Sequence, residues 1–428
     1  MRILWLSHFV PYPPRGGALQ RSHHLLRQAA RRHEVHLVAM NQRALLPTPQ
    51  SVAEAVAALS PLCSRVDVFP NLFDASRVRW AAMAAAGIWR RRPYDVRWLW
   101  QPSLSRFLAD LADGAPFDVV HVDTVGLMPH AAAFGDLPLV LNHHNIESQM
   151  LHRRAERDPG VMRRLYCRRE AAKLQRYERE ACRRAAVNIT VSALDAERLL
   201  ALVPGVRARV VENGVDIEYF HPARTRGRAG SLVFAGTMNW YPNQEAMRFF
   251  LREVWPLLLA ENPERHLTVI GREPPAEVLV ATRQGRVSAP GFVEDVRPYL
   301  AEAAIYVCPI RDGGGTRLKV LDALAMQKPL VATGLAVEGL ELVEDEHYLR
   351  AESPADFVRQ IRRLEESPEL CERLGANGRR LVEARYAWDE IGRRLEQAYA
   401  TARATSSTDG RQLRNSRSSV HNALSRAP

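Results

Sequence analysis

The chain has 428 residues and a formal net charge of +11 at pH 7, with 46% hydrophobic and 25% charged residues. This composition is ordinary for a soluble globular protein, and the length fits two to three domains. The five cysteines are scattered and none forms a C-x-x-C pair. Their spacing argues against a disulfide framework and a zinc site, and it favours a reducing cytoplasm.

The positive charge is concentrated in two stretches of the chain. Residues 151–186 contain eleven Arg and one Lys against four Glu and one Asp (12 − 5 = +7), and residues 401–428 contain five Arg and one Asp (5 − 1 = +4). Together they account for the whole +11. A nucleic-acid-binding protein would carry basic charge across its core fold. We therefore expect no nucleic-acid partner, and an anionic membrane surface fits the basic segment at least as well.

The first half of the chain predicts a parallel α/β domain, because short apolar runs alternate with helical patterns. Its first apolar run is too short for a signal peptide. The longest apolar stretch, Trp80–Trp89, is too short to cross a bilayer, which takes about 20 apolar residues. Six buried strands are expected, at Ile3–Ser7, Val35–Ala39, Val66–Phe69, Val119–Val122, Leu139–Asn142 and Val187–Val191.

The second half repeats the same alternation after a linker that is rich in Gly and Arg. We expect domains at residues 1–206 and 231–385, a linker at 207–230, a returning helix at 386–404 and a disordered basic tail at 405–428. The last helical pattern begins at Arg379 and continues to Ala404. Strands are expected at Leu232–Ala235, Leu267–Ile270, Ile305–Pro309 and Leu330–Ala332.

Three consecutive glycines, Gly313–Gly315, stand between a strand that ends at Pro309 and a helix expected from about Thr316. Glycines let backbone N–H groups approach a ligand, and a helix start adds unpaired donors and a positive dipole end. Cations in a first turn, here Arg317 and Lys319, cost roughly 0.3–1 kcal/mol unless an anion is bound. Phosphate fits both side chains. The alternative is a flexible loop before a helix with solvated charges.

Residues 308–329 resemble the donor site of family-4 (group 1) glycosyltransferases. That family has the α/β GT-B fold, with two Rossmann-like domains facing across a cleft and a C-terminal helix crossing back to the first domain. The resemblance aligns Asp322 with the family's second Glu, which holds the ribose hydroxyls. The family's first Glu, which contacts the donor sugar, falls at Gly314, and Asp312 is the candidate replacement. The alternative role of Asp322 is a surface pair with Lys319.

Further blocks extend the resemblance over about residues 1–400. After Gly236 the family often has a cation, whereas this chain has Asn239 and Asn243, so Arg317 and Lys319 would carry more of the phosphate charge. Asn243 fits equally well as a helix cap. The implied donor-binding residues are Gly16, Gly17, Gly236, Asn239, Arg272, Phe292, Val293, Asp312, Gly313, Gly314, Gly315, Thr316 and Asp322, with Phe292 and Val293 in the loop that reads the base.

In the first half, Gly16 and Gly17 follow the first strand and resemble the family's first glycine loop. His144 ends a buried strand and aligns with the family's histidine that contacts the donor sugar, whereas His143 is expected to orient or pack. A histidine at a strand end also serves as an ordinary hydrogen-bonding residue. Glu147 is predicted to bind an acceptor hydroxyl, or else to cap the next helix.

The resemblance implies a retaining hexosyltransferase with His144, Arg317 and Lys319 as catalytic residues. The donor would be a nucleotide-diphosphate sugar and the acceptor a carbohydrate or lipid-linked sugar. No Asp-x-Asp ends a predicted strand and no His/Cys cluster has ligand spacing, so we expect neither metal nor cofactor. The chain also resembles sugar transferases of exopolysaccharide and exosortase-associated clusters.

Location and two rival functions complete the expectations. A cytoplasmic enzyme is expected, and residues 77–92 together with the basic segment would place it peripherally on the inner face of the membrane. A core helix with solvated arginines explains residues 77–92 equally well. The rivals are a sugar-nucleotide epimerase on the same fold and a non-catalytic basic protein that binds nucleic acid.

Overall fold

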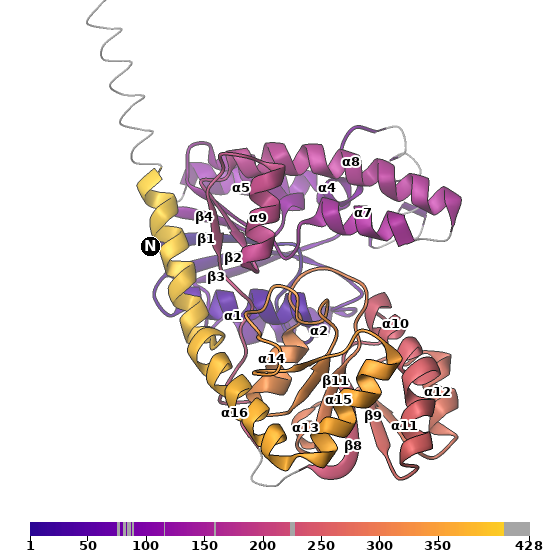
Figure 1. The fold of residues 1–428 in the computed structure, drawn as a ribbon. Coiled ribbons are helices and arrows are strands. Elements are labelled where there is room, and N and C mark those ends of the chain that lie inside the picture. Colours follow the sequence, from indigo (N-terminus) through magenta and orange to yellow (C-terminus); the bar gives the residue numbers. More distant parts are fainter. Residues whose placement is uncertain are drawn as a thin grey trace, which may run out of the picture. The chain divides into compact units, whose positions relative to one another are not determined.

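The computed structural model describes the chain except for residues 75–77, 80–82, 84–86, 88–89, 115, 158–159, 223–226 and 406–428. Most of the apolar segment at 77–92 and the expected basic tail therefore lie outside the described residues. The chain forms two compact units, Met1–Val211 with Gly392–Pro428 and Glu212–Ile391 (Figure 1). Below they are called the N-terminal unit and the C-terminal unit.

The N-terminal unit is built on a parallel sheet with the order β3-β2-β1-β4-β5-β6-β7 in the described residues. Its strands are β1 (Arg2–Ser7), β2 (Glu34–Asn41), β3 (Arg65–Pro70), β4 (Val119–Val122), β5 (Leu139–Asn142), β6 (Val187–Thr190) and β7 (Ala208–Val210). Its helices are α1 (Gly17–Ala30), α2 (Pro49–Leu59), α4 (Tyr94–Leu99), α5 (Pro102–Gly114), α6 (Met128–Ala131), α7 (Glu147–Arg157), α8 (Val161–Arg184) and α9 (Ala193–Leu202).

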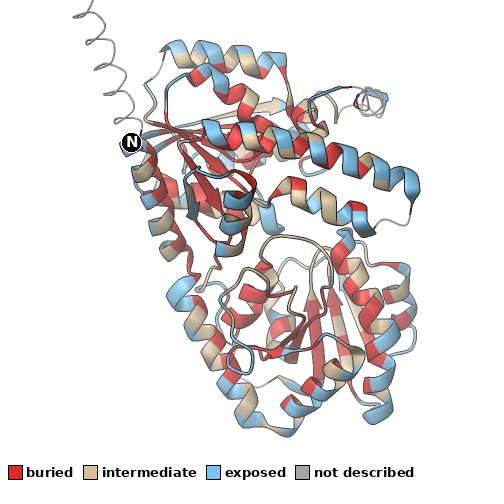
Figure 2. Cartoon of the chain, turned by 45° about the horizontal axis from the view of Figure 1, so that its top comes forward, coloured by how far each residue is buried: buried red, intermediate tan, exposed pale blue. Residues whose placement is uncertain are grey.

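The central strands of this sheet are buried along their whole length. Strands β4, β5 and β6 are buried at every position, and Figure 2 shows the strands as buried and the helices as striped. Helices on both faces of a parallel sheet explain this pattern. Strand β1 lies between β2 and β4, so the order of the connections reverses there. Ligands of such sheets bind at the carboxyl ends of the strands at the reversal.

The C-terminal unit repeats this plan with the strand order β10-β9-β8-β11-β12-β13 in the described residues, and its reversal lies between β8 and β11. Its strands are β8 (Arg228–Ala235), β9 (His266–Ile270), β10 (Val287–Gly291), β11 (Ala303–Cys308), β12 (Leu330–Ala332) and β13 (Leu349–Arg350). Its helices are α10 (Tyr241–Phe249), α11 (Trp255–Glu261), α12 (Ala276–Thr282), α13 (Arg297–Glu302), α14 (Leu318–Ala325), α15 (Pro354–Glu366) and α16 (Pro368–Arg385).

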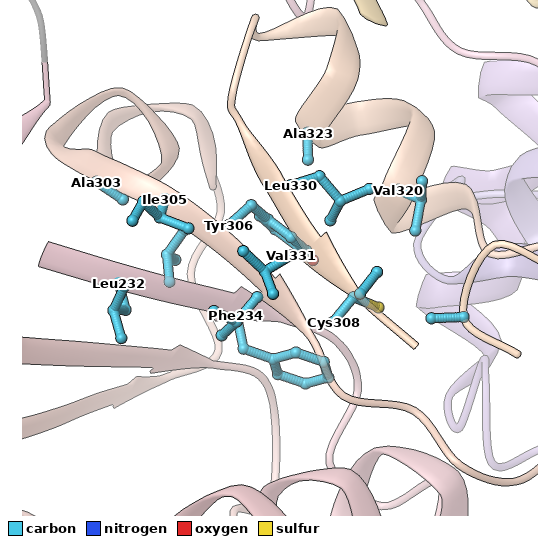
Figure 3. Packing of buried hydrophobic residues seen from close by; sticks show 14 of the residues in the cluster. Leu232, Phe234, Ala303, Ile305, Tyr306, Cys308, Val320, Ala323, Leu330 and Val331 are labelled. Carbon is cyan, nitrogen blue, oxygen red and sulfur yellow. The ribbon is translucent and has the colours of Figure 1, made fainter. Parts of the chain in front are cut away.

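Helix α14 is anchored directly on the centre of this second sheet. Figure 3 shows Val320 and Ala323 of α14 beside Leu330 and Val331 of β12, within a single buried cluster. Val320 and Ala323 are both completely buried. Because α14 is fixed by this core, the glycine loop that precedes it connects two rigid elements, β11 and α14.

Every strand expected from the sequence is present within a few residues, and the fold is the expected α/β pair of Rossmann-like units. Three strands were not predicted, β7, β10 and β13, and each lies at the edge of a sheet. The residues expected to form the linker, 207–230, include β7 and the start of β8. Edge strands bury less surface and so carry a weaker apolar pattern, as the half-exposed residues of β7 illustrate.

The prediction of one unbroken helix from Arg379 to Ala404 is wrong. Helix α16 ends at Arg385 and a second helix runs over residues 388–405. The break occurs because the carbonyl of Tyr386 accepts the N–H of Val215 at 2.8 Å. The second helix belongs to the N-terminal unit from Gly392 onward, which confirms the expected return to the first domain. Glu396 binds His33 at 2.7 Å, and the Tyr399 hydroxyl lies 3.0 Å from Nδ1 of His121.

Candidate functional site

Residues predicted to bind the donor gather at the carboxyl edge of the second sheet. Gly236 follows β8, Arg272 follows β9, Phe292 follows β10 and the loop Gly313–Gly315 follows β11. Strands β8 and β11 flank the reversal of strand order. The structure therefore brings together side chains from four separate stretches of sequence at the edge where ligands of this fold bind.

The glycine loop has backbone angles that only glycine adopts easily. Gly313 has φ 105° and Gly315 has φ 70°. The Arg317 guanidinium donates hydrogen bonds to the carbonyls of Gly314 and Gly315, and the residue is only 4% exposed. Arg317 is the N-cap of α14, so the prediction that it lies in the first helical turn is wrong. In this structure Arg317 holds the loop closed on itself.

Lys319 lies in the first turn of α14, as expected, and points back toward the end of β8. Its Nζ donates to Oδ1 of Asn243 at 2.5 Å and lies 4.6 Å from the ring centroid of Phe234. Burial, together with the nearby positive charge of Arg317, lowers the pKa of Lys319 to about 8. A Cβ at Gly236 would crowd this Nζ, so the glycine leaves room for the Lys319 side chain.

Asn243 does not cap α10, which was the alternative that the sequence left open. The N-cap of α10 is Trp240, which makes no side-chain cap. Asn243 is 2% exposed, accepts from Lys319 and donates to the carbonyl of Thr237 at 2.8 Å. It therefore aims the lysine. Asn239, by contrast, lies exposed in the turn after β8.

The acids of the loop and helix have distinct environments. Oδ1 of Asp312 accepts the N–H of Gly313 at 2.6 Å, so this carboxylate shapes the loop. Burial raises the pKa of Asp322 to about 7, and Lys319 opposes that rise. Lys319 and Asp322, both described, form no ion pair within 4.0 Å, so the alternative of a surface pair is wrong.

The neighbouring turns complete this edge. The Thr316 hydroxyl accepts from Nδ2 of Asn213 at 2.6 Å, so a residue of the expected linker holds the glycine loop directly. The Arg272 guanidinium lies 5.4 Å from the ring centroid of Phe292, which is 45% exposed. The Val293 side chain packs against the hydrophobic core, which leaves its backbone for contact with a ligand.

The carboxyl edge of the first sheet is organised around Asp123, a residue that the sequence did not single out. Asp123 follows β4 and is completely buried. Its carboxylate accepts from the Ser22 hydroxyl at 2.5 Å, Nδ2 of Asn142 at 2.6 Å and Nε2 of His144 at 3.2 Å. An acid directly after a buried strand was the available signal. Arg21 in turn donates to Oδ1 of Asn142 at 2.9 Å.

Burial and neighbouring charges shift the pKa values of the acid and of two histidines in this network. Burial opposes the ionisation of Asp123, but His144 more than compensates and holds the pKa of that carboxyl well below its usual range. Burial lowers the pKa of His8 to about 4 and that of His121 to about 3. At neutral pH the ionised Asp123 carboxylate therefore lies beside the neutral imidazoles of His8 and His121.

One group in the described part of the chain has the composition of a metal site. The ligand atoms of His8, Asp123 and His144 all lie within 4.8 Å of one another. The sequence predicted no such group, because the three residues follow three different strands. The carboxylate of Asp123 already accepts hydrogen bonds from Ser22 and Asn142, so a metal would compete with these donors.

Glu147 lies in the first turn of α7, but it does not cap that helix. The N–H groups of Glu147 and Ser148 donate to Glu178, at 2.9 and 3.3 Å. The Glu147 carboxyl accepts from the Thr124 hydroxyl at 2.9 Å. Burial, followed by the charges of Asp95 and Glu178, raises the pKa of Glu147 to about 8.

The first glycine loop leads directly into α1. Gly16 is the N-cap of α1 with φ 100°, and a Cβ there would meet no atom within 4 Å. Gly16 and Gly17 are both exposed. The glycine at position 16 is therefore required by its backbone angle, and the space beside it is open in the N-terminal unit.

Both halves of the chain match models of known families. Residues 15–219 match the model described as Glycosyltransferase Family 4, and residues 229–367 match Glycosyl transferases group 1. The chain belongs to the family-4, group 1 glycosyltransferases. It is an α/β protein of the GT-B class.

A curated relative is the protein named "Putative glycosyltransferase EpsD" of Bacillus subtilis (strain 168). It is 29% identical over 217 residues, which make up 45% of this chain and 55% of the relative. The chain thus spans about half the length of the curated relative that it matches.

Solved structures share the fold over nearly the whole chain. Sucrose-phosphate synthase from Thermosynechococcus elongatus has a TM-score of 0.68 at 16% identity, covering 94% of this chain and 100% of that structure. HepE of Anabaena in complex with UDP has a TM-score of 0.63 at 16% identity, with the same coverage of 94% and 100%. At these identities the likeness concerns the fold alone.

None of the described helices is both long enough and apolar enough to span a membrane.

Proposed function

We propose that this glycosyltransferase moves a hexose from a nucleotide-diphosphate sugar to a carbohydrate or lipid-linked acceptor, with retention at the anomeric carbon. The observation that carries the proposal is the buried Lys319, whose ammonium Asn243 aims at the loop after β8. A buried cation at a helix start that follows a glycine loop suits a diphosphate. HepE, which shares the fold, has been crystallised with UDP-glucose.

The chemistry follows from charge stabilisation of the leaving group. As the glycosidic bond to the donor breaks, negative charge grows on the diphosphate, and Lys319 and the N–H groups of Gly314 and Gly315 would stabilise it. Arg317 is proposed to assist by exchanging loop carbonyls for phosphate oxygens. Asp322 is proposed to hold the ribose, and His144 to steady the sugar, as the family resemblance implies. These charges replace a divalent ion, and we propose metal-independent transfer.

The setting of the reaction is part of the same proposal. The resemblance to exopolysaccharide enzymes and the likeness to EpsD support a role in bacterial exopolysaccharide or surface glycan synthesis. The acceptor would be an unfinished glycan, free or attached to a lipid. We propose that the enzyme acts in the cytoplasm.

A two-step experiment tests the proposal. First, thermal shift against UDP-, GDP- and ADP-sugars identifies the donor, because a ligand that binds only the folded state raises apparent stability. Second, transfer to glycan acceptors is followed with and without a chelator, and the anomer is read by NMR. An inverted product, or loss of transfer with the chelator, contradicts the corresponding claim. Conversion of the donor without acceptor would favour the epimerase.

A further inference from the structure

Helices α7 and α8 form a long hairpin in the N-terminal unit, and its far end lies beyond the hydrophobic core (Figure 1). The first buried residue of α8 is Cys167, six positions after the helix begins at Val161. We call the described residues 150–156 and 160–169 the hairpin tip. Figure 2 shows mostly exposed surface at this end of α8.

The hairpin tip exposes aliphatic side chains on one face of α8. Val161 is 60% exposed, Met162 79% and Leu165 56%. Leu165 follows Val161 by four positions and Met162 by three, so the three side chains lie together. Cys167, at about 100° per residue, points to the opposite side, where α8 meets the core. The aliphatic face is therefore turned away from the protein.

Arginines surround this aliphatic face. Residues 150–169 contain seven Arg against one Glu and one Asp (7 − 2 = +5). Arg164 and Arg168 flank the aliphatic face on α8, and Arg154 lies on α7. Within the described residues none of these three, nor Arg163, forms an ion pair. The tip thus combines a net positive charge with exposed aliphatic groups.

We infer that the hairpin tip docks the enzyme on an anionic lipid surface. Unpaired arginines gain about 1 kcal/mol each near anionic headgroups, and the three aliphatic side chains enter the boundary between headgroups and acyl chains. Long arginine stems let the charges reach the headgroups while the helix lies in the interface. A nucleic-acid backbone would use the charge but would leave Val161, Met162 and Leu165 exposed to water.

This inference goes beyond the proposed sugar transfer, because it concerns only where the enzyme sits. Docking of the N-terminal unit would hold the enzyme near acceptors that are attached to lipids. Sugar transfer to a water-soluble acceptor would not need the hairpin tip. The two proposals can therefore fail separately.

The test is sedimentation of the full-length protein with vesicles. We expect binding to vesicles of 30% phosphatidylglycerol in phosphatidylcholine, at least tenfold weaker binding to pure phosphatidylcholine, and weakening at 0.5 M NaCl. The triple variant Arg163→Glu/Arg164→Glu/Arg168→Glu should lose binding. The variant Val161→Ser/Met162→Ser/Leu165→Ser should bind at least tenfold more weakly while keeping the same charge.

Matched controls carry changes of the same kind at other exposed positions. Arg32→Glu/Arg106→Glu/Arg283→Glu lowers the net charge by the same amount, and Leu257→Ser/Leu279→Ser removes exposed aliphatic groups from the C-terminal unit. Both should bind vesicles like the unaltered protein. Thermal unfolding and donor binding confirm that each variant is folded.

Three outcomes would overturn the inference. They are equal binding to both kinds of vesicle, wild-type binding by the two hairpin variants, and absence of binding to any vesicle. Hairpin-dependent binding to single-stranded DNA without vesicle binding would assign the tip to nucleic acid instead. Normal donor binding in every variant would leave the proposed transferase function intact.

Discussion

The two sheets share a topology, but different chemical groups lie at their carboxyl edges. In the C-terminal unit the edge carries a glycine loop and the buried side chain of Lys319, whose pKa is lowered to about 8. In the N-terminal unit the edge is a closed hydrogen-bond network around the ionised Asp123. We propose that the edge of the C-terminal unit binds an anion, whereas the edge of the N-terminal unit fixes the orientation of the His144 side chain. The shared fold thus determines where the ligands bind, and local side chains determine what each edge does.

The largest expected effect is on turnover, through the edge of the C-terminal unit that is proposed to bind the diphosphate. Lys319→Ala should lower turnover by about 10²–10³-fold, the size seen when a main electrostatic donor is removed. The measurement is kcat with the donor identified by thermal shift. Arg283→Ala, an exposed position in the same unit, is the control and should change little. Near-normal turnover of Lys319→Ala would remove the basis for the comparison.

The next effect is on the buried network. Asp123→Asn keeps the shape but removes the charge that holds His144, and we expect kcat to fall by roughly 10–100-fold because general positioning is lost. Donor binding in the C-terminal unit, measured by thermal shift, should stay the same. A change in donor affinity with unchanged kcat would show that the two edges are not separate in function. Ser22→Ala, which removes one donor only, should have a smaller effect.

A pH titration of donor affinity tests the part that Lys319 plays in this comparison. The free ammonium has a pKa of about 8, so raising the pH through 8 removes the charge that attracts the diphosphate. One unit above the pKa about one tenth of the lysines stay charged, and donor affinity at pH 9 should fall about tenfold. Lys319→Arg keeps its charge and should show a flat profile from pH 7 to 9. An equally steep profile in that variant would assign the titration to another group.

The smallest effect expected is on stability, in the carboxyl cluster near the first edge. Glu147 has a raised pKa of about 8 in the folded state, against about 4.5 in the unfolded chain. Between these values the folded state keeps a proton that the unfolded chain releases, so stability falls as the pH rises from about 5 to 8. Glu147→Gln should reduce this change in the free energy of unfolding, by roughly 1–3 kcal/mol across the pH window. Urea unfolding at pH 5.5 and pH 8 measures it, and parallel slopes would contradict the assignment.

Much of the fold could be predicted because its signals are local. Buried parallel strands such as β4 and β5 are short apolar runs, and the loop Gly313–Gly315 is visible as a glycine cluster between a strand and a helix. The family resemblance followed from the block at 308–329. The edge strands β7, β10 and β13 lacked an apolar pattern of this strength, because they pair on one side only.

The sequence by itself determined the class of fold, the place of the glycine loop and the presence of Lys319 at a helix start. Only the tertiary structure decided what these residues touch. Lys319 meets Asn243 across 76 positions of the chain, and Ser22 meets Asp123 across 101. Such contacts depend on strand order and on packing, and the spacing of residues along the chain carries no record of either. The break after Arg385 has the same origin, because a distant strand-like segment at Val215 captures the backbone of Tyr386.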